Sequence, residues 1–359
     1  MTKKKIFFVL PSLKAGGAER VISFLTTNLD SNVFEIKLLV VGFKKDSVYN
    51  LDNLDVTFFN QKRLLNGVYP LYKLIKNNNP DIVFGTIRHV NIILGIYNLI
   101  FKNVRFIVRE ASVMSVMLKF SNSKQQIPNF LLKFLYNHLD AIVCQSNDIK
   151  KDLINQLGII ESKLTTINNP ITQIEHLSFS KTKCSDLINF ITIGRLSEEK
   201  GHERILKGLA KVKNYSYSYT IIGSGPLELK IKDLANELGI LDKIKFIAHT
   251  SKVLDFLSNS DFFIQGSYVE GFPNAVLESC SVGTPVLGFN CPGGTKEIIE
   301  DGINGVLAIT EDDFNKTLQN LNEIPGFERA VVRASVLSKF SSQKIIKEYE
   351  NLFLSVLAC

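Results

Sequence analysis

The chain has 359 residues, enough for two domains of typical size. Hydrophobic residues make up 45% and charged residues 21%, which is ordinary for a globular protein and excludes a mostly disordered chain. Residues 1–180 carry 22 Lys+Arg and 13 Asp+Glu, a net charge of +9, whereas residues 181–359 carry 20 and 22, a net charge of −2. This asymmetry fits an anionic partner for the first half, such as nucleic acid, an acidic membrane or a phosphorylated substrate. A solvated lysine-rich face fits the same numbers.

Apolar runs alternate with helical patterns through the first half. Strands are expected at residues 6–10, 36–41, 56–59, 81–84, 104–108, 141–144 and 164–167, and helices at 18–29, 70–76 and 148–157. Continuous apolar strands that alternate with helices are typical of a parallel sheet covered on both faces. Residues 171–186 are polar and without a clear period, and we expect a linker there.

The same pattern restarts after the linker. Strands are expected at residues 188–193, 219–222, 244–247, 261–265 and 285–288, and helices at 202–212, 226–238 and 343–356. The sequence therefore predicts an α/β fold of two doubly wound, Rossmann-like domains that face each other across a cleft. The expected domains are residues 1–172 and 187–340, and residues 341–359 form a last helix that packs back on the first domain. Ligands of such folds bind in the loops beyond the carboxyl ends of the strands.

Cysteines and apolar segments indicate a cytosolic protein. The five cysteines, at 144, 184, 280, 291 and 359, are odd in number and not spaced as a metal or redox motif, so reduced and buried thiols are expected. The apolar run at residues 6–10 is too short for a signal peptide, and residues 90–101 are too few for a membrane span. Contact with a membrane surface stays open.

The first post-strand loop carries Gly16 and Gly17 just before a helix. Adjacent glycines let a ligand approach the backbone, and free amides at a helix start favour an anion. A tight turn that requires positive φ explains the same glycines equally well. The loop is not G-x-G-x-x-G, so the dinucleotide fingerprint is absent.

Two further loops follow the first strands of the second half. Arg195 and Lys200 lie five residues apart before a helix, and two cations beside a helix start suit a diphosphate. The alternative for Lys200 is an ordinary exposed lysine. Gly223 opens a Gly-Ser-Gly-Pro turn, which alone is a weak signal.

The strongest segment is residues 267–278, which carry Glu270 on a loop and Glu278 on the following helix. Carboxylates accept paired hydroxyls, which suits ribose or hexose recognition. The backbone at residues 272–275 is expected to offer donors to an anion or sugar oxygen. Two surface glutamates are the alternative. In the first half, Glu110 follows a strand and is expected to project into the cleft, or else to cap a surface helix.

Together these motifs resemble the retaining glycosyltransferases of family four, which have the GT-B fold. The resemblance covers nearly the whole chain. The motifs that carry it are Gly16-Gly17-Ala18-Glu19-Arg20, Gly194-Arg195-Leu196 followed by Glu199-Lys200-Gly201, Gly223-Ser224-Gly225-Pro226 and the pair Glu270 and Glu278 in an E-x7-E segment. Each motif is weak alone, but their order and positions make the set specific.

The resemblance implies a role for each of these residues. Arg195 and Lys200 would hold the donor diphosphate, Glu278 would bind the ribose, and Glu270 would contact the donor sugar. Further donor contacts would come from Gly16, Gly17, Gly223, His249, Thr250 and the backbone amides of Phe272, Pro273 and Asn274.

The sequence departs from the family at one position. Many members have a histidine near the reacting sugar where this chain has Ala111, so catalysis is expected to depend more on Glu110 and the two cations. No Asp-x-Asp pair lies in a post-strand loop, and neither a metal ion nor a cofactor is expected. Fixed cations at the leaving phosphate are the main catalytic requirement.

The resemblance implies transfer of a hexose or N-acetylhexosamine from a nucleotide-sugar, in particular a UDP-sugar, to a lipid-linked or free glycan acceptor. A polyprenyl-diphosphate-linked acceptor in bacterial surface polysaccharide synthesis is expected, with no nucleic-acid partner. Residues 118–135 mix apolar residues with Lys119, Lys124 and Lys133, a pattern that fits peripheral binding to the anionic inner face of the cytoplasmic membrane. Ordinary packing with solvated lysines explains the same stretch equally well. The alternatives are a sugar-nucleotide epimerase of the same architecture and a basic binding module without enzymatic activity.

Overall fold

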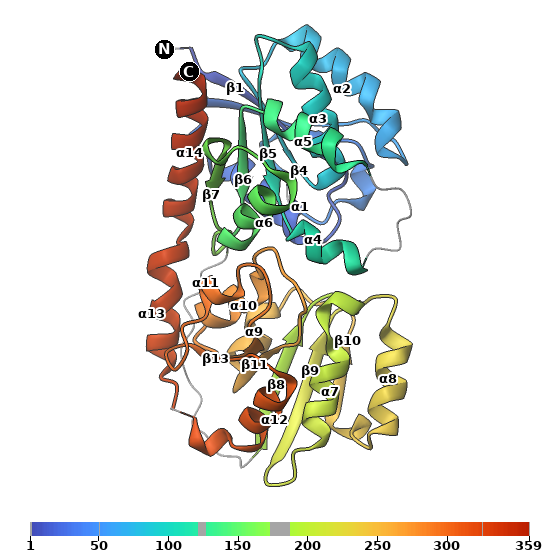
Figure 1. The fold of residues 1–359 in the computed structure, drawn as a ribbon, viewed down its shortest axis with the longest axis vertical. Helices are drawn as coiled ribbons and strands as arrows, with labels where there is room; N and C mark the ends of the chain where they lie inside the picture. The colour runs from blue at the N-terminus through green and yellow to red at the C-terminus, as the bar shows by residue number, and fades with distance from the viewer. Residues whose placement is uncertain (1, 50, 121–126, 173–186, 325, 359) are drawn as a thin grey trace. The chain divides into compact units, whose positions relative to one another are not determined.

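The chain folds into two compact units. The computed structural model describes residues 2–49, 51–120, 127–172, 187–324 and 326–358 (Figure 1). The first unit comprises Met1–Ser115, Asn122–Thr172 and Ser342–Cys359, and the second comprises Val116–Ser121 and Gln173–Ser341. Of the linker expected at residues 171–186, residues 173–186 lie outside the described part of the chain.

The first unit is built on a parallel sheet of seven strands in the order β3-β2-β1-β4-β5-β6-β7. The strands are β1 Lys4–Leu10, β2 Phe34–Val40, β3 Asp55–Phe58, β4 Ile82–Thr86, β5 Arg105–Glu110, β6 Ala141–Cys144 and β7 Leu164–Thr166. The helices are α1 Gly17–Asn28, α2 Leu64–Asn78, α3 Arg88–Ile100, α4 Met114–Met117 at the boundary of the units, α5 Asn129–His138, α6 Asn147–Leu157 and α14 Ser342–Ala358. Strand order reverses between β1 and β4, and ligands of doubly wound sheets bind at such a point.

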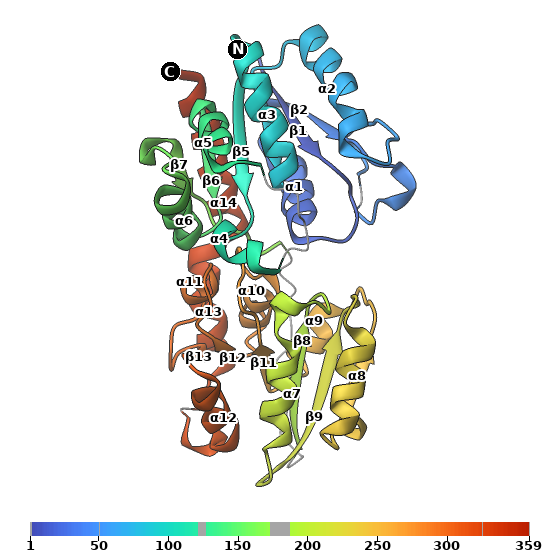
Figure 2. The ribbon, with the colours of Figure 1, turned by 45° about the vertical axis from the view of Figure 1, so that its right-hand side comes forward.

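The second unit repeats this plan with six parallel strands in the order β10-β9-β8-β11-β12-β13. The strands are β8 Leu187–Ile193, β9 Ser216–Ile222, β10 Ile244–Ile247, β11 Phe262–Gln265, β12 Val286–Phe289 and β13 Gly305–Ala308. The helices are α7 His202–Ala210, α8 Glu228–Glu237, α9 Val253–Ser258, α10 Asn274–Ser281, α11 Thr295–Ile298, α12 Glu311–Gln319 and α13 Arg329–Phe340. Helix α7 packs between α12 and α8 (Figure 2). Strand order reverses between β8 and β11.

The predicted α/β class with two doubly wound parallel sheets is confirmed, and three details differ. Helix α2 begins at Leu64, so Pro70 lies inside it and does not open it. Strand β13 was not predicted, because four residues that begin with a glycine give little periodic signal. Helix α13 was not predicted, whereas the last helix expected at residues 343–356 is present as α14.

Helix α14 completes the core of the first unit. Its residues Ile345, Tyr349 and Phe353 repeat every four positions, which places them on one helix face, and all are buried. They join the core that β1 and α1 build. The Phe353 ring lies 5.6 Å from the Phe84 ring between centroids, and its contacts with Phe8 and Phe34 are also edge-on.

The three cysteines in the described residues are buried and free, as expected; they are Cys144, Cys280 and Cys291. Cys184 and Cys359 lie outside the described residues. None of the helices in the described part of the chain has the length and apolar character needed to span a bilayer.

Replacing Phe353 with alanine is expected to destabilise the first unit by about 3–5 kcal/mol, because it leaves a cavity among aromatic rings. Urea unfolding monitored by circular dichroism should show the transition of the first unit at lower denaturant. Leu354→Ala is the matched control, since Leu354 is exposed on the same helix. Equal midpoints for the two variants would show that α14 adds little to this core.

Candidate functional site

The loops after β8 and β9 are joined by backbone contacts at the carboxyl edge of the second sheet. The amide of Gly194 donates to the Ile222 carbonyl at 3.0 Å, and the amide of Gly223 donates to the Ile247 carbonyl at 2.8 Å. Gly223 has φ +152°, and a Cβ there would lie 1.9 Å from the Gly194 carbonyl oxygen. Only glycine therefore fits, and this predicted motif holds two loops in contact.

His249 and Thr250 follow β10, next to the Gly223 loop, because β10 pairs with β9. His249 is exposed, and the Thr250 hydroxyl accepts a hydrogen bond from the Lys252 amide at 3.1 Å. Both residues therefore lie at the same sheet edge as Gly223, with which they are predicted to contact the donor.

The loops after β8 and β11 meet at the point where the strand order reverses. Gly201 has φ +59°, and a Cβ there would lie 1.8 Å from the Gly266 carbonyl oxygen. The Tyr268 amide also donates to the Glu199 carbonyl at 2.8 Å. The two loops that carry Lys200 and Glu270 are thus in direct backbone contact.

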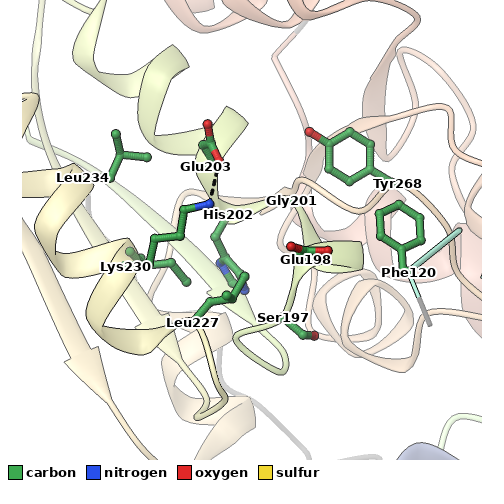
Figure 3. A pocket seen from close by; sticks show the side chains of 11 residues that line it. Phe120, Ser197, Glu198, Gly201, His202, Glu203, Leu227, Lys230, Leu234 and Tyr268 are labelled. Atoms are coloured by element: carbon green, nitrogen blue, oxygen red, sulfur yellow. Dashed lines mark ion pairs between the residues drawn. The ribbon is translucent and has the colours of Figure 1, made fainter. Parts of the chain in front are cut away.

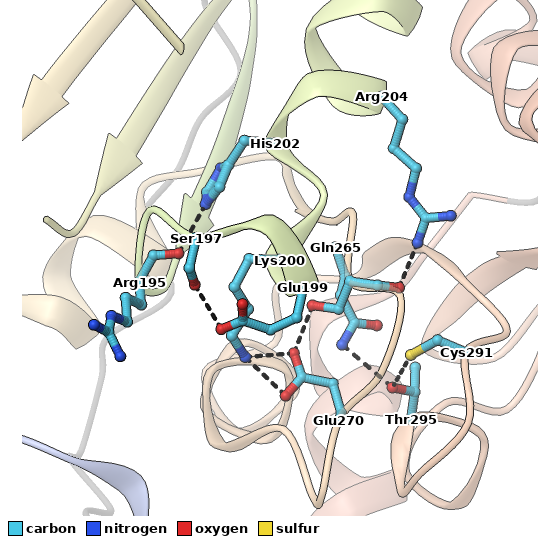
Figure 4. A network of polar contacts seen from close by, with 11 residues as sticks. Arg195, Ser197, Glu199, Lys200, His202, Arg204, Gln265, Glu270, Cys291 and Thr295 are labelled. Carbon is cyan, nitrogen blue, oxygen red and sulfur yellow. Dashed lines mark hydrogen bonds and ion pairs between the residues drawn. The ribbon is translucent and has the colours of Figure 1, made fainter. Parts of the chain in front are cut away.

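Lys200 and Glu270 form an ion pair across these loops (Figure 4). The Lys200 ammonium donates to both carboxylate oxygens of Glu270, at 2.7 and 2.8 Å, and the Ser267 hydroxyl donates to one of them at 2.5 Å. Burial disfavours the charged ammonium, but the adjacent Glu270 outweighs it and raises the pKa of Lys200. The lysine therefore stays a fixed cation at neutral pH.

Arg195 does not join this pair. Its side chain is exposed and extends away from Lys200 and Glu270 (Figure 4). Its carbonyl accepts a hydrogen bond from the Nε2–H group of His202 at 3.1 Å. Burial lowers the pKa of His202, which fixes the neutral ring in that contact. The structure thus places the two predicted cations on one loop with separate surroundings.

Helix α10 begins directly after this loop and carries Glu278, whose side chain is buried. Asn274 is the first residue of α10 and Pro273 precedes it as the cap. The expected hydrogen bond from the backbone of Pro273 is wrong, because proline has no N–H group to donate. Phe272 is buried and packs its ring on Phe340, with centroids 5.3 Å apart.

The Pro292-Gly293-Gly294 loop after β12 fixes the backbone of Glu270. The Glu270 amide donates to the Pro292 carbonyl at 3.0 Å, and the Gly294 amide donates to the Gly271 carbonyl at 2.9 Å. Gly293 has φ +124°, and a Cβ there would lie 2.0 Å from the Glu270 carbonyl oxygen. This glycine pair therefore helps to position the loop that carries Glu270.

Gly16 and Gly17 lie in the first unit, where α1 begins. Gly16 is extended, with φ −159°, so the turn does not require positive φ. Its backbone is instead approached closely: a Cβ on Gly16 would lie 2.2 Å from a carboxylate oxygen of Glu19. The Tyr49 hydroxyl also donates to the Gly16 carbonyl at 2.9 Å.

The expectation that Glu110 projects into a cleft is wrong. Its side chain is buried inside the first unit, where its carboxylate accepts hydrogen bonds from Asn91 at 2.6 Å and from the Tyr136 hydroxyl. Burial raises the pKa of Glu110, against the opposing effect of these hydrogen bonds. β5 ends inside the helix layer of α3 and α5, so the strand end does not expose this carboxylate.

Two buried arginines were missed by the sequence reasoning. Arg109 is fully buried and donates to the Asn169 side chain at 2.5 Å, with no ion-pair partner among the described residues. Arg204 donates to the Gly266 carbonyl at 2.6 Å and also to the Ser267 carbonyl, which holds the loop that carries Glu270. Neither arginine belongs to a recognisable motif. From sequence alone an arginine is expected at the surface, because its burial depends on partners that are distant in the sequence.

Ile87 is a third residue without a sequence signal. It follows β4, at the reversal of strand order in the first sheet, and has φ +73°. Positive φ in a β-branched residue is strained by roughly 1–3 kcal/mol, and such strain concentrates at functional sites.

A pocket of about 210 Å³ lies beside the ion pair, between α7 and α8 (Figure 3). Its lining includes Leu227, Lys230 and Leu234 from the side of α8, and Glu198 and Tyr268 from the loops. Lys200, Glu270 and Glu278 do not line it. The pocket and the Lys200–Glu270 pair are therefore separate features of the second unit.

Family models match both halves of the chain. Residues 15–173 match the model described as Glycosyltransferase Family 4, and residues 173–334 match Glycosyl transferases group 1. The two matches together span both structural units, and they give no support to the epimerase alternative.

Similar proteins come from bacterial glycan synthesis. The chain is 25% identical to N-acetylgalactosamine-N,N'-diacetylbacillosaminyl-diphospho-undecaprenol 4-alpha-N-acetylgalactosaminyltransferase of Campylobacter jejuni, over 89% of each chain. It is 26% identical, over 86% of each chain, to a second N-acetylgalactosaminyltransferase of that organism, whose named substrate is also a PP-undecaprenol-linked glycan.

The fold is also that of a solved glycosyltransferase. The lipopolysaccharide outer core galactosyltransferase WaaB superposes with a TM-score of 0.78 and 21% identity, over 98% of this chain and 99% of that one. The two parallel sheets, the motif loops at their carboxyl edges and the matches to both family models agree. The chain therefore belongs to the family 4 glycosyltransferases with the GT-B fold.

Proposed function

We propose that this glycosyltransferase moves a hexose or N-acetylhexosamine from a UDP-sugar to a polyprenyl-diphosphate-linked glycan, with retention of anomeric configuration and without a metal ion. The product would belong to a bacterial surface polysaccharide, made at the inner face of the cytoplasmic membrane. The observation that carries the proposal is the Lys200–Glu270 ion pair at the reversal point of the second sheet, directly before α10.

The chemistry of sugar transfer explains why such a pair is useful. Negative charge grows on the leaving diphosphate while positive charge grows at the anomeric carbon. Lys200 supplies a fixed cation, and Glu270 supplies a carboxylate held by Ser267 beside it. An ammonium has three N–H groups, so Lys200 can bind Glu270 and still donate to a phosphate oxygen.

The acceptor class is supported by the relatives. Both Campylobacter jejuni enzymes are named for undecaprenol-linked diphosphate substrates. The basic first half of the chain, with its net charge of +9, suits an acceptor that carries a diphosphate.

Incubation of the purified chain with candidate UDP-sugars and undecaprenyl-diphosphate-linked glycans tests the proposal directly. An α-linked donor should give an α-linked product, which nuclear magnetic resonance of the anomeric proton identifies. A β-linked product would overturn retention, and donor hydrolysis without transfer to any lipid-linked glycan would overturn the acceptor class.

Glu278→Ala is expected to weaken nucleotide-sugar binding by about 10- to 100-fold, because hydrogen bonds from ribose hydroxyls to a charged acceptor are lost. Calorimetric titration measures this affinity. Glu237→Ala, on the exposed surface of α8, is the control and should bind as the unmodified protein does. Unchanged affinity in a folded Glu278→Ala variant would remove this residue from the donor site.

Lys200→Ala and Arg195→Ala are each expected to lower kcat by about 10²–10³ and to change KM less, because the charge that they meet grows in the transition state. Loss of Lys200 also strands the Glu270 carboxylate, so the Lys200→Ala/Glu270→Gln double variant separates the two effects. Lys211→Ala is the exposed control. A normal kcat with only a raised KM would make these residues ground-state binders.

Activity is expected to survive excess chelator, because Lys200 and Arg195 offer the charge that a divalent ion would otherwise supply at the diphosphate. Initial rates with and without EDTA, followed by added Mg²⁺ or Mn²⁺, measure this. A rate that falls in chelator and returns with the metal would contradict metal independence.

A further inference from the structure

Three neighbouring helices of the first unit each expose a pair of large apolar side chains four residues apart. Residues at i and i+4 lie on the same face of a helix, so each pair forms one exposed stripe. We call these six residues the apolar helix face; they are Leu65 (77% exposed) and Tyr69 (72%) on α2, Ile96 (44%) and Ile100 (53%) on α3, and Phe130 (76%) and Phe134 (48%) on α5.

The three helices form one continuous layer. Helices α2 and α3 are joined by the Tyr97 hydroxyl, which donates to the Val68 carbonyl at 2.5 Å. Helices α3 and α5 approach closely, because a Cβ on Gly95 would lie 3.0 Å from the Cβ of Leu135. The three exposed stripes therefore belong to one side of the first unit.

These stripes are additional to the faces that build the core. Helix α5 already buries Leu132, Leu135 and Tyr136, and its exposed phenylalanines lie outside that buried set. Scattered exposed apolar residues are normal, but six in one layer indicate an interaction surface.

Basic residues outnumber acidic ones around the apolar helix face, and Asp140, two residues after α5, is paired with Arg105. Helices α2, α3 and α5 contain no Asp or Glu, and between residues 56 and 139 the only acidic residues are Asp81 and Glu110. Glu110 is buried, and Asp81 accepts a hydrogen bond from the Lys5 amide at 2.7 Å.

Exposed cations surround the same helices. Five lysines are exposed on or next to them, namely Lys62 before α2, Lys73 and Lys76 on α2, Lys102 after α3 and Lys133 on α5. An apolar stripe bordered by lysines and lacking carboxylates is complementary to a lipid surface with anionic headgroups.

We propose that the apolar helix face docks on an anionic bilayer, with Phe130 and Phe134 inserted at the boundary between headgroups and acyl chains and Lys133 among the headgroups. This face shares Phe130, Lys133 and Phe134 with the surface expected at residues 118–135 and extends it to α2 and α3. Residues 116–121 group with the second unit, whereas α5 belongs to the first, and Lys124 lies outside the described residues. The inference depends on exposure and charge, not on the proposed sugar transfer.

Co-sedimentation of the full chain with vesicles tests the docking. Vesicles of equal parts phosphatidylglycerol and phosphatidylcholine should bind the protein at about 0.1 M salt and release it at about 1 M, because screening shortens the reach of the lysine charges. Phe130→Ser/Phe134→Ser should lower partitioning at least about tenfold. Lys102→Ser/Lys133→Ser should lower it by roughly tenfold at low salt only.

Matched controls use the second unit. Leu229→Ser/Ile309→Ser removes two apolar side chains as exposed as Phe130, and Lys211→Ser/Lys213→Ser removes two exposed lysines. Both controls should partition like the unmodified protein. Equal losses in the control and test variants would overturn the assignment of the face.

The absence of tryptophan from the chain permits a direct measurement of depth. Phe130→Trp should show a blue-shifted emission on anionic vesicles and quenching by bromine-labelled acyl chains, whereas Leu229→Trp should show neither. Binding without quenching at Phe130 would place the membrane contact elsewhere. No vesicle binding, together with a dimer in sedimentation velocity that Phe130→Ser/Phe134→Ser abolishes, would show that the face binds a second copy.

Activity on a water-soluble acceptor analogue keeps this test separate from the proposed function. If the face docks on lipid, Phe130→Ser/Phe134→Ser retains that activity while it loses vesicle binding. A chain that binds vesicles as described but transfers no sugar would leave the docking surface intact and remove the proposed function.

Discussion

The Lys200–Glu270 ion pair is the interaction around which the second unit is arranged. It joins the loops that follow the neighbouring strands β8 and β11, and its two residues are 70 positions apart in the sequence. A half-buried ammonium is stable there because the carboxylate offsets its desolvation, and the carboxylate in turn is held by Ser267 and by its own backbone contact with Pro292. Close backbone approaches at Gly201 and Gly293 bring these loops near enough for the pair to form.

Buried arginines serve the two units differently. Arg204 satisfies carbonyls of the loop after β11 and lies over the rings of Tyr268 and Phe289, so its charge is shared among fixed groups near the ion pair. Arg109 is fully buried in the interior of the first unit, where burial lowers its pKa and nearby Tyr349, Glu110 and Glu19 act in the opposite direction.

Much of the fold could be predicted because buried strands appear in the sequence as short, continuous apolar runs. β6 was expected with the bounds that it has, since four buried residues stand between clear breaks. Pro70 was misleading because proline favours a first helical turn but is tolerated inside α2. The loops of the candidate site were found by their position after strands and by the family resemblance.

What could not be predicted depends on distant partners. The pairing of Lys200 with Glu270 and the exposed position of Arg195 follow from how four loops pack, which no local pattern reports. The burial of Glu110, at the end of strand β5, depends on Tyr136 of helix α5. Helices α3 and α5 are apolar on more than one face, and the sequence does not indicate which of these faces is buried and which is exposed.

Helix α14 has a consequence for the order in which the chain can fold. All six strands of the second unit lie between residues 173 and 341, so they are all available before α14 is synthesised. The first unit is interrupted, and Phe8, Phe34 and Phe84 gain their partner Phe353 only when the chain is nearly complete. During synthesis the aromatic core of the first unit therefore stays incomplete until α14 is made, whereas the second unit can fold before that. A chimera that exchanges the first domain between relatives must exchange its last helix with it.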